Sequence, residues 1–158
     1  TNLREEGVMD AGDLCNRDVV TIGKGERVLE AARRMRQQHV GTLVVVDDEA
    51  ATPRPLGMIT DRDIVVGVVA EDPEDLDRFL VGDVMSFDVT TAYEDEGLDE
   101  VLARMRREGI RRIPVVDDDD TLVGIVALDD LLEALSRQLD EVSRLVAREI
   151  QIEREVRD

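Results

Sequence analysis

Hydrophobic residues follow two different periods along this chain, and the two periods alternate in a regular order. Between residues 27 and 38 apolar side chains recur every three or four positions, as they do on one face of a helix. Residues 42–46 are mostly β-branched and almost unbroken, which predicts a strand buried on both faces. Apolar runs at 19–22 and 56–60 predict two more strands, and 61–69 reads as a second helix. The predicted order is strand, helix, strand, strand, helix.

The same order occurs a second time further along the chain. Residues 28–36 and 98–106 share Glu, Arg, Met and Arg at matching places, at an offset of 70 (98 − 28). After the second hairpin the offset falls to 67 (124 − 57), because the loop at 49–55 in the first copy is three residues longer. One register over most of the chain indicates an internal duplication.

The duplication predicts the organisation of the chain. The first copy is expected at residues 8–70, an acidic helical connector at 71–80, the second copy at 81–135 and an extension at 136–158. The expected fold class is α+β, with two β-α-β-β-α units and a long C-terminal helix.

The C-terminal stretch departs from the repeat. No Gly or Pro occurs between residues 129 and 156, and apolar residues recur there at three- and four-residue steps. They are Leu132, Leu135, Leu139, Val142, Val146 and Ile150. This spacing predicts an amphipathic helix longer than one small repeat can cover. Its apolar stripe needs either its own domain or the same helix of a second chain, and we favour a homodimer.

Composition adds a strong negative charge to this picture. Asp and Glu total 38 against 20 Lys and Arg, for a formal net charge of −18. Such a surface repels phosphate backbones and anionic lipid, so partners of either class, nucleic acid or membrane, are disfavoured. Lys24 is the one lysine, and we interpret an acidic surface poor in lysine as adaptation to a high-salt cytosol.

Cysteine usage and the apolar runs bear on the cellular compartment. Cys15 is alone, so no intrachain disulfide can form and a reducing interior is the default. No apolar run approaches the roughly 20 residues that cross a bilayer, and the first residues lack the pattern of a signal peptide. The expected location is the cytoplasm.

Short motifs in both copies resemble those of the CBS-domain family. Residues 57–63 read GMITDRD, close to the ligand signature of that family, and residues 112–116 read RIPVV. Residues 124–130 read GIVALDD, with Ala127 where Thr or Ser is usual. The resemblance covers roughly residues 12–135. It implies two repeats packed sheet to sheet about a pseudo-twofold axis, with two clefts between them.

The resemblance also implies a ligand for these clefts. Members of the family commonly bind AMP, ADP, ATP or S-adenosylmethionine there, and two such pairs usually associate into a disc-like dimer. The residues expected to contact the ligand are Thr21, Thr42, Thr60, Arg62, Asp63, Thr91, Arg111, Arg112, Pro114 and Asp130.

Two carboxylates carry the most specific chemistry of this set. Asp63 and Asp130 are expected in the first helical turn of each copy, where a carboxylate can accept hydrogen bonds from both ribose hydroxyls. Thr60 can donate to a phosphate at the same helix start. The alternative is a helix cap, because Thr60 and Asp63 match the Ser/Thr-x-x-acid pattern. Asp130 persists where Ala127 cannot cap, which favours ribose binding, while the missing Thr makes the second cleft the weaker candidate.

Three arginines are candidates for neutralising phosphates. Arg111 and Arg112 are neighbours on an expected strand, so they should point to opposite faces and only one should enter a given cleft. The alternative for these two and for Arg62 is an ordinary exposed side chain. By the resemblance, the groups near the adenine are Thr21, Thr42, Thr91 and Pro114. The alternative for Thr21 and Thr91 is a surface β-branched residue, and the alternative for Pro114 is a strand entrance.

These features predict a binding module. We find no nucleophile with its base, no Cys/His cluster and no Gly-rich phosphate loop, so the chain is expected not to be an enzyme and to hold no metal. In the leading interpretation, nucleotide occupancy changes the angle between the repeats, and an unidentified partner reads that change. The alternative is a structural or dimerisation module with empty clefts, in which the C-terminal helix drives assembly.

Overall fold

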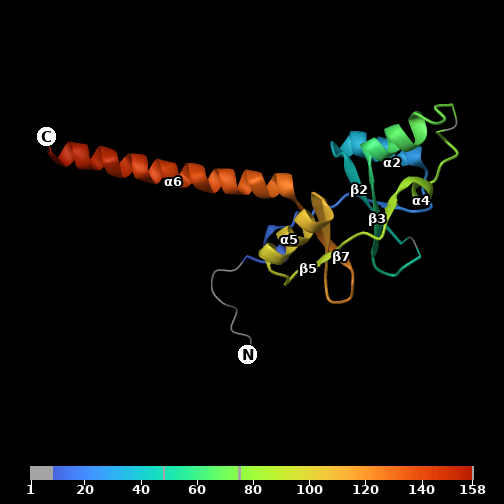
Figure 1. Ribbon diagram of the computed structural model, residues 1–158, viewed down its shortest axis with the longest axis horizontal. Helices are drawn as coiled ribbons and strands as arrows, with labels where there is room; N and C mark the ends of the chain where they lie inside the picture. The colour runs from blue at the N-terminus through green and yellow to red at the C-terminus, as the bar shows by residue number, and fades with distance from the viewer. Residues whose placement is uncertain (1–8, 48, 75, 158) are drawn as a thin grey trace. The chain divides into compact units, whose positions relative to one another are not determined.

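A computed structural model describes residues 9–47, 49–74 and 76–157, the side chains of 134 and 149–157 excepted. The chain divides into two units, Thr1–Val126 and Ala127–Asp158. The first unit contains the first copy of the repeat and the second copy as far as Val126, and the second unit consists mainly of one long helix (Figure 1).

The first repeat forms its elements in the predicted order. They are α1 (Ala11–Leu14), β1 (Thr21–Gly23), α2 (Val28–Gln38), β2 (Thr42–Val46), β3 (Pro55–Thr60), α3 (Asp61–Ile64) and the π-helical turn η1 (Val65–Val69). β1 runs parallel to β2, and β2 runs antiparallel to β3 beside it (Figure 1).

The second repeat follows the same plan, and its last helix is the start of the long helix. The elements are α4 (Val81–Val84), β4 (Ser86–Phe87), β5 (Ala92–Tyr93), α5 (Leu98–Glu108), β6 (Arg112–Val116), β7 (Leu122–Ala127) and α6 (Leu128–Arg157). Strands β1 to β4 form one sheet and β5 to β7 form another. The predicted α+β fold class and the long C-terminal helix are confirmed.

An aliphatic core holds the first repeat together. Leu43, Val44 and Val45 of β2 are each at most 1% exposed, so this strand is buried on both faces as its unbroken apolar run predicts. α2 adds Val28 and Met35, which its three- and four-residue spacing places on one face of the helix.

Each repeat completes the sheet of the other. β4, which belongs to the second half of the chain, pairs Ser86 with Met58 of β3. In the equivalent place Asn16 of the first half bridges to Ile125 of β7. Residues 16 and 86 differ by 70 and residues 58 and 125 by 67, so these are the same contact made twice. The pair of repeats is therefore packed sheet to sheet about a pseudo-twofold axis, as the fold class requires.

The short helices α1 and α4 repeat the exchange. The N–H of Gly82 in α4 donates to the carbonyl of Lys24 at 2.9 Å, and the N–H of Gly12 in α1 donates to the carbonyl of Glu94 at 2.9 Å. Both members of each pair are again related by the offset of 70. Each repeat is thus hydrogen-bonded to the segment that opens the other.

The connector between the repeats differs from its prediction. Within 71–80 the described residues form turns and no helix. Pro73 lacks an N–H and disfavours helical backbone at the residue before it, which prevents a continuous helix. Phe79 instead packs against the first core, and its carbonyl accepts from the N–H of Val28 at 2.9 Å. The prediction of a helical connector is wrong.

The helix that follows β3 is confirmed, with a change of hydrogen bonding midway. After the single turn of α3, the N–H of Ala70 donates to the carbonyl of Val65 at 2.9 Å, five residues back. Such a π-turn is uncommon and widens the helix locally.

The second unit is dominated by α6, which confirms the predicted long amphipathic helix. Thirty residues at 1.5 Å per residue give it a length of about 45 Å. None of the described helices combines the length and the apolar character needed to cross a membrane.

Candidate functional site

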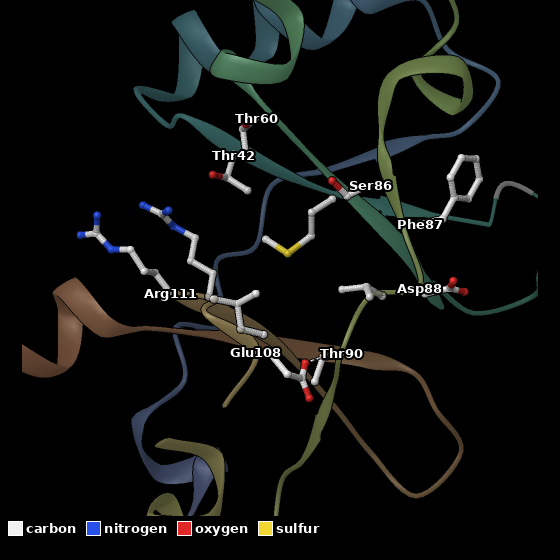
Figure 2. Close-up of a pocket in the computed structure, with 12 residues that line it drawn as sticks. Thr42, Thr60, Ser86, Phe87, Asp88, Thr90, Glu108 and Arg111 are labelled. Atoms are coloured by element: carbon white, nitrogen blue, oxygen red, sulfur yellow. Dashed lines mark hydrogen bonds between the residues drawn. The ribbon is translucent and has the colours of Figure 1, made fainter. Parts of the chain in front are cut away.

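A cavity of about 390 Å³ is formed by both repeats of the first unit (Figure 2). This volume is within the range of small-molecule sites. The first repeat contributes Thr42, Met58 and Thr60; the second half of the chain contributes Ser86, Phe87, Asp88, Val89, Thr90, Glu108, Ile110, Arg111 and Arg112. Strands and short linkers from both repeats therefore build one site.

The first repeat presents two hydroxyls to the cavity. Thr42 begins β2 and Thr60 ends β3, and the antiparallel register makes them direct partners. Cross-strand partners in a sheet lie about 5 Å apart and on the same face. The pairing of β2 with β3 therefore places the two threonines side by side at one wall of the cavity.

The wall formed by 86–90 is a product of the exchange between repeats. Ser86 and Phe87 are held on β3 as strand β4, and the chain then turns at Asp88, whose φ of 57° is left-handed. Aspartate tolerates this conformation better than most residues. The turn leads directly to Val89 and Thr90, which line the same cavity.

Both neighbouring arginines enter this cavity. Arg111 comes before β6 and Arg112 is the first residue of the strand, so the alternation of a regular strand does not yet govern their directions. Arg111 is exposed and Arg112 is half-buried. The prediction that only one of the two can enter a given cleft is wrong.

Glu108, one of the two acidic residues in the cavity lining, is bonded to a neighbouring hydroxyl. The hydroxyl of Thr90 donates to the carboxylate of Glu108. This hydrogen bond, helped by Arg107, lowers the pKa of Glu108 below its usual value, so the carboxyl is ionised at neutral pH. The equivalent positions of the first repeat are Val20 and Gln38, which cannot form this pair.

The cavity has chemically different ends. Figure 2 shows Arg111 at one end, and Phe87 with Asp88 at the other. Apolar side chains complete the lining: Met58, Val89 and Ile110. The arrangement can accept a molecule with an anionic group at one end and an apolar, flat group between.

Asp63 is engaged in a helix cap. Its Oδ2 accepts from the N–H and the hydroxyl of Thr60, both at 2.8 Å, and its own N–H donates to Thr60 Oγ1 at 3.1 Å. The capping alternative is therefore confirmed. Asp63 and Arg62 line a different cavity, of about 340 Å³, together with Asp83 of α4. All the carboxylate bonds of the cap use Oδ2, so a ribose contact through Oδ1 stays a prediction.

The cap gives a stability prediction. Thr60→Ala removes the hydroxyl that accepts from the N–H of Asp63, and we expect the free energy of unfolding to fall by about 1 kcal/mol. Thr60→Ser keeps the oxygen and is expected to remain within about 0.5 kcal/mol of the natural chain. Urea unfolding followed by circular dichroism measures both. Equal stability of the two variants would contradict the role of the cap.

The remaining candidates lie outside the 390 Å³ cavity. Thr21 and Thr91 use their carbonyls to accept from Arg34 and Arg104, at 2.8 and 2.6 Å. Thr21 is the first residue of β1. The other two are Pro114, buried inside β6, and Asp130, exposed in the second unit. Their roles as ligand contacts stay predictions.

Sequence reasoning missed much of the cavity wall. Met58, Val89 and Ile110 are ordinary apolar residues, and nothing in their type separates a cavity lining from a core. Glu108 ends a helix and carries no motif. The duplication could have pointed to part of this wall. Residues 88–91 align with 18–21, so the segment before the first long helix has the same length in both copies. Across the described residues, we find no group of three or more His, Cys, Asp or Glu side chains arranged to hold a metal ion.

Comparison with known protein families gives two matches within the chain. The pattern of the family described as CBS domain matches residues 11–69 and again 81–137. An uncharacterized protein of Methanopyrus kandleri is 37% identical over 125 residues, which is 79% of this chain. The chain spans 62% of the length of that relative.

Two solved structures with bound ligands are similar to this chain. The CBS domain pair of the protein MJ0100, in complex with 5′-methylthioadenosine and S-adenosyl-L-methionine, is 27% identical with a TM-score of 0.70. The match covers 83% of this chain and 98% of that one. The cytosolic domain of the Mg²⁺ channel MgtE, in complex with ATP, is 29% identical with a TM-score of 0.66, covering 80% and 48%.

Proposed function

The chain belongs to the CBS domain family, and on that premise we propose that it is a regulatory module that binds an adenosine nucleotide in the cavity between its repeats. One observation carries the proposal. Two arginines and three apolar side chains, contributed by both repeats, line the same 390 Å³ cavity. A nucleotide needs both kinds of group at once.

The phosphate would lie at the arginine end. Guanidinium groups bind phosphate oxygens through paired, charge-assisted hydrogen bonds, and Arg111 and Arg112 supply two of them. The hydroxyl of Thr42 adds a donor on the opposite wall. On a chain with a net charge of −18, these side chains create a local site for an anion.

The base would lie among the apolar residues. Met58, Val89 and Ile110 offer the flat apolar contacts that a purine ring prefers, and the thioether of methionine adapts to the ring. The ionised carboxylate of Glu108 and that of Asp88 supply acceptors for sugar hydroxyls. AMP, ADP and ATP fit this distribution better than S-adenosylmethionine, whose sulfonium is repelled by the arginines.

The other ligand contacts expected from the sequence stay part of the proposal. Asp63, with Arg62 beside it, would accept through Oδ1 from the ribose of a ligand in the separate 340 Å³ cavity, and Asp130 would do the same in the second copy. Thr21, Thr91 and Pro114 would bound the base. Because Ala127 replaces the usual hydroxyl residue, we propose that the second copy forms the weaker of the two sites.

Occupancy would act on the junction between the repeats. Residues 86–90 join the first sheet as β4 and also line the cavity, so a ligand that contacts them changes how the repeats are tied together. A partner that reads this change completes the regulatory role, and we propose binding instead of catalysis. The single lysine among 20 basic residues leads us to propose a high-salt cytosol as its setting, and a homodimer as its working form.

Titration calorimetry tests the proposal. The purified chain in high salt is titrated separately with AMP, ADP, ATP and S-adenosylmethionine, with inosine monophosphate as the base-exchanged control. We expect saturable binding of at least one phosphorylated adenosine ligand, tighter than that of S-adenosylmethionine. The absence of binding heat for every adenosine ligand would refute the proposal.

A structural module without a ligand is the second candidate. The specific observation in its favour is the exposed apolar stripe of α6, which needs a partner whatever the cavity holds. If this second candidate is correct, the calorimetric titrations give no binding heat, and assembly of the chain depends on α6.

A further inference from the structure

Five of the six exposed large apolar residues described in α6 follow a strict heptad, and the sixth is Leu145. Starting at Leu132 they are spaced by three, four, three and four residues; the series is Leu132, Leu135, Leu139, Val142 and Val146. These side chains are 58%, 57%, 69%, 57% and 51% exposed, respectively. In a heptad lettered a to g they occupy only positions a and d, the pattern of a seam between two coiled helices.

Charge is distributed around the same heptad in a selective way. Six charged residues lie between Leu132 and Arg148, and all six are at positions b, c or f: Glu133, Arg137, Asp140, Glu141, Arg144 and Arg148. Arg137 pairs with Glu133 along this outer face, at 3.9 Å. More than a third of all residues in the chain are charged, so an uncharged inner face is a marked exception.

The positions that flank the seam are uncharged. They are Ser136, Gln138, Ser143 and Leu145, at positions e and g. Three of these four are polar, which keeps the apolar face as narrow as a two-stranded coiled coil requires. In coiled coils e and g residues also choose the partner by charge. A helix without charge there does not repel a copy of itself, even in a protein with a net charge of −18.

We infer that residues 132–148 of α6 pair with the same segment of a second copy of this chain in a two-stranded coiled coil. The inference specifies the surface behind the proposed homodimer and does not depend on nucleotide binding. The seam from Leu132 to Val146 is about 21 Å long, at 1.5 Å per residue. A foreign helix would normally be selected by charges at e and g, and residues 132–148 supply none.

Two matched variants test this interface. Leu139→Asp places a carboxylate at an a position of the seam, and Ala147→Asp places one at an exposed b position of the same helix. Both change an apolar residue to aspartate and alter the net charge equally. Sedimentation equilibrium of the full chain, in high salt, gives the mass of each assembly.

We expect the mass of Leu139→Asp to fall to half that of the natural chain or less, and Ala147→Asp to keep the natural mass. An oligomeric natural chain whose mass is unchanged by Leu139→Asp would overturn the seam. A monomeric natural chain would overturn the homodimer as well. Nucleotide titrations of both variants are expected to match those of the natural chain, so failure of the interface and failure of the binding proposal are distinguishable.

Discussion

Replacing Gly57 with alanine is expected to lower the free energy of unfolding by about 2–3 kcal/mol and to weaken nucleotide binding with it. Gly57 lies in β3 between two strands, opposite Val45 of β2 and Phe87 of β4. A Cβ at this position would overlap the carbonyl oxygen of Ser86 and lie 3.3 Å from the sulfur of Met85. A backbone oxygen cannot rotate away, so β4 must separate from β3.

The loss of binding follows from the position of β4. Since residues 86–90 are held on the first sheet by β4 and line the cavity, a displaced β4 opens one wall of the site. Urea unfolding and calorimetry on the same sample measure both effects. Gly97→Ala is the matched control, because an added Cβ there meets nothing within 4 Å and φ is −60°. We expect this control to change stability by less than about 1 kcal/mol. Equal stability of the two variants would contradict the tight β3–β4 contact.

Removing both arginines of the cavity is expected to weaken the binding of AMP by about 100-fold or more. Each charge-assisted hydrogen bond is worth about 1.5–3 kcal/mol, so Arg111→Ala with Arg112→Ala removes at least two such bonds to phosphate. Adenosine carries no phosphate, and its affinity is expected to change by less than about threefold. Calorimetric titration of each variant with AMP and with adenosine measures this difference.

The control for this pair is a double variant that removes the same charge elsewhere. Arg36 and Arg106 are exposed on α2 and α5 and do not line the cavity. Arg36→Ala with Arg106→Ala is expected to bind AMP nearly as the natural chain does, because screened charges at a distance contribute little. If both double variants lost affinity equally, net charge and not direct contact would explain the binding.

The duplication made the fold accessible from sequence. The alignment of 28–36 with 98–106 predicts two equal units, and the change of period within each unit predicts its helices and strands. The hydrophobic pattern is clear in both elements, because β2 is apolar at every buried position and α2 has one apolar face. The connector was missed because acidic residues favour a helix while Pro73 excludes one, and the proline dominates.

The exchange between repeats was not accessible in the same way. The pairing of Met58 with Ser86 joins segments that are 28 residues apart (86 − 58). A strand of two residues has no sequence pattern from which its partner strand could be predicted. The site depends on this exchange, which is why Val89 and Glu108 were not identified. Arg111 and Arg112 were identified by charge, but their presence in one cavity depends on where β6 begins, and the boundaries of an element are the hardest feature to predict from sequence.

The role of Asp63 could not be predicted from the sequence for a different reason. The Ser/Thr-x-x-acid pattern is required by the helix start and by the family signature alike, so the residues alone cannot separate the two roles. The geometry settles the cap, since Oδ2 takes both bonds from Thr60. It leaves Oδ1 for the ribose contact that the proposal assigns to it.

A crystal structure of the chain grown with AMP measures the position of the ligand directly. The phosphate is expected about 2.7–3.2 Å from guanidinium nitrogens of Arg111 and Arg112, with the adenine among Met58, Val89 and Ile110. Nucleotide density confined to the cavity beside Arg62, or an empty 390 Å³ cavity at saturating AMP, would contradict this assignment.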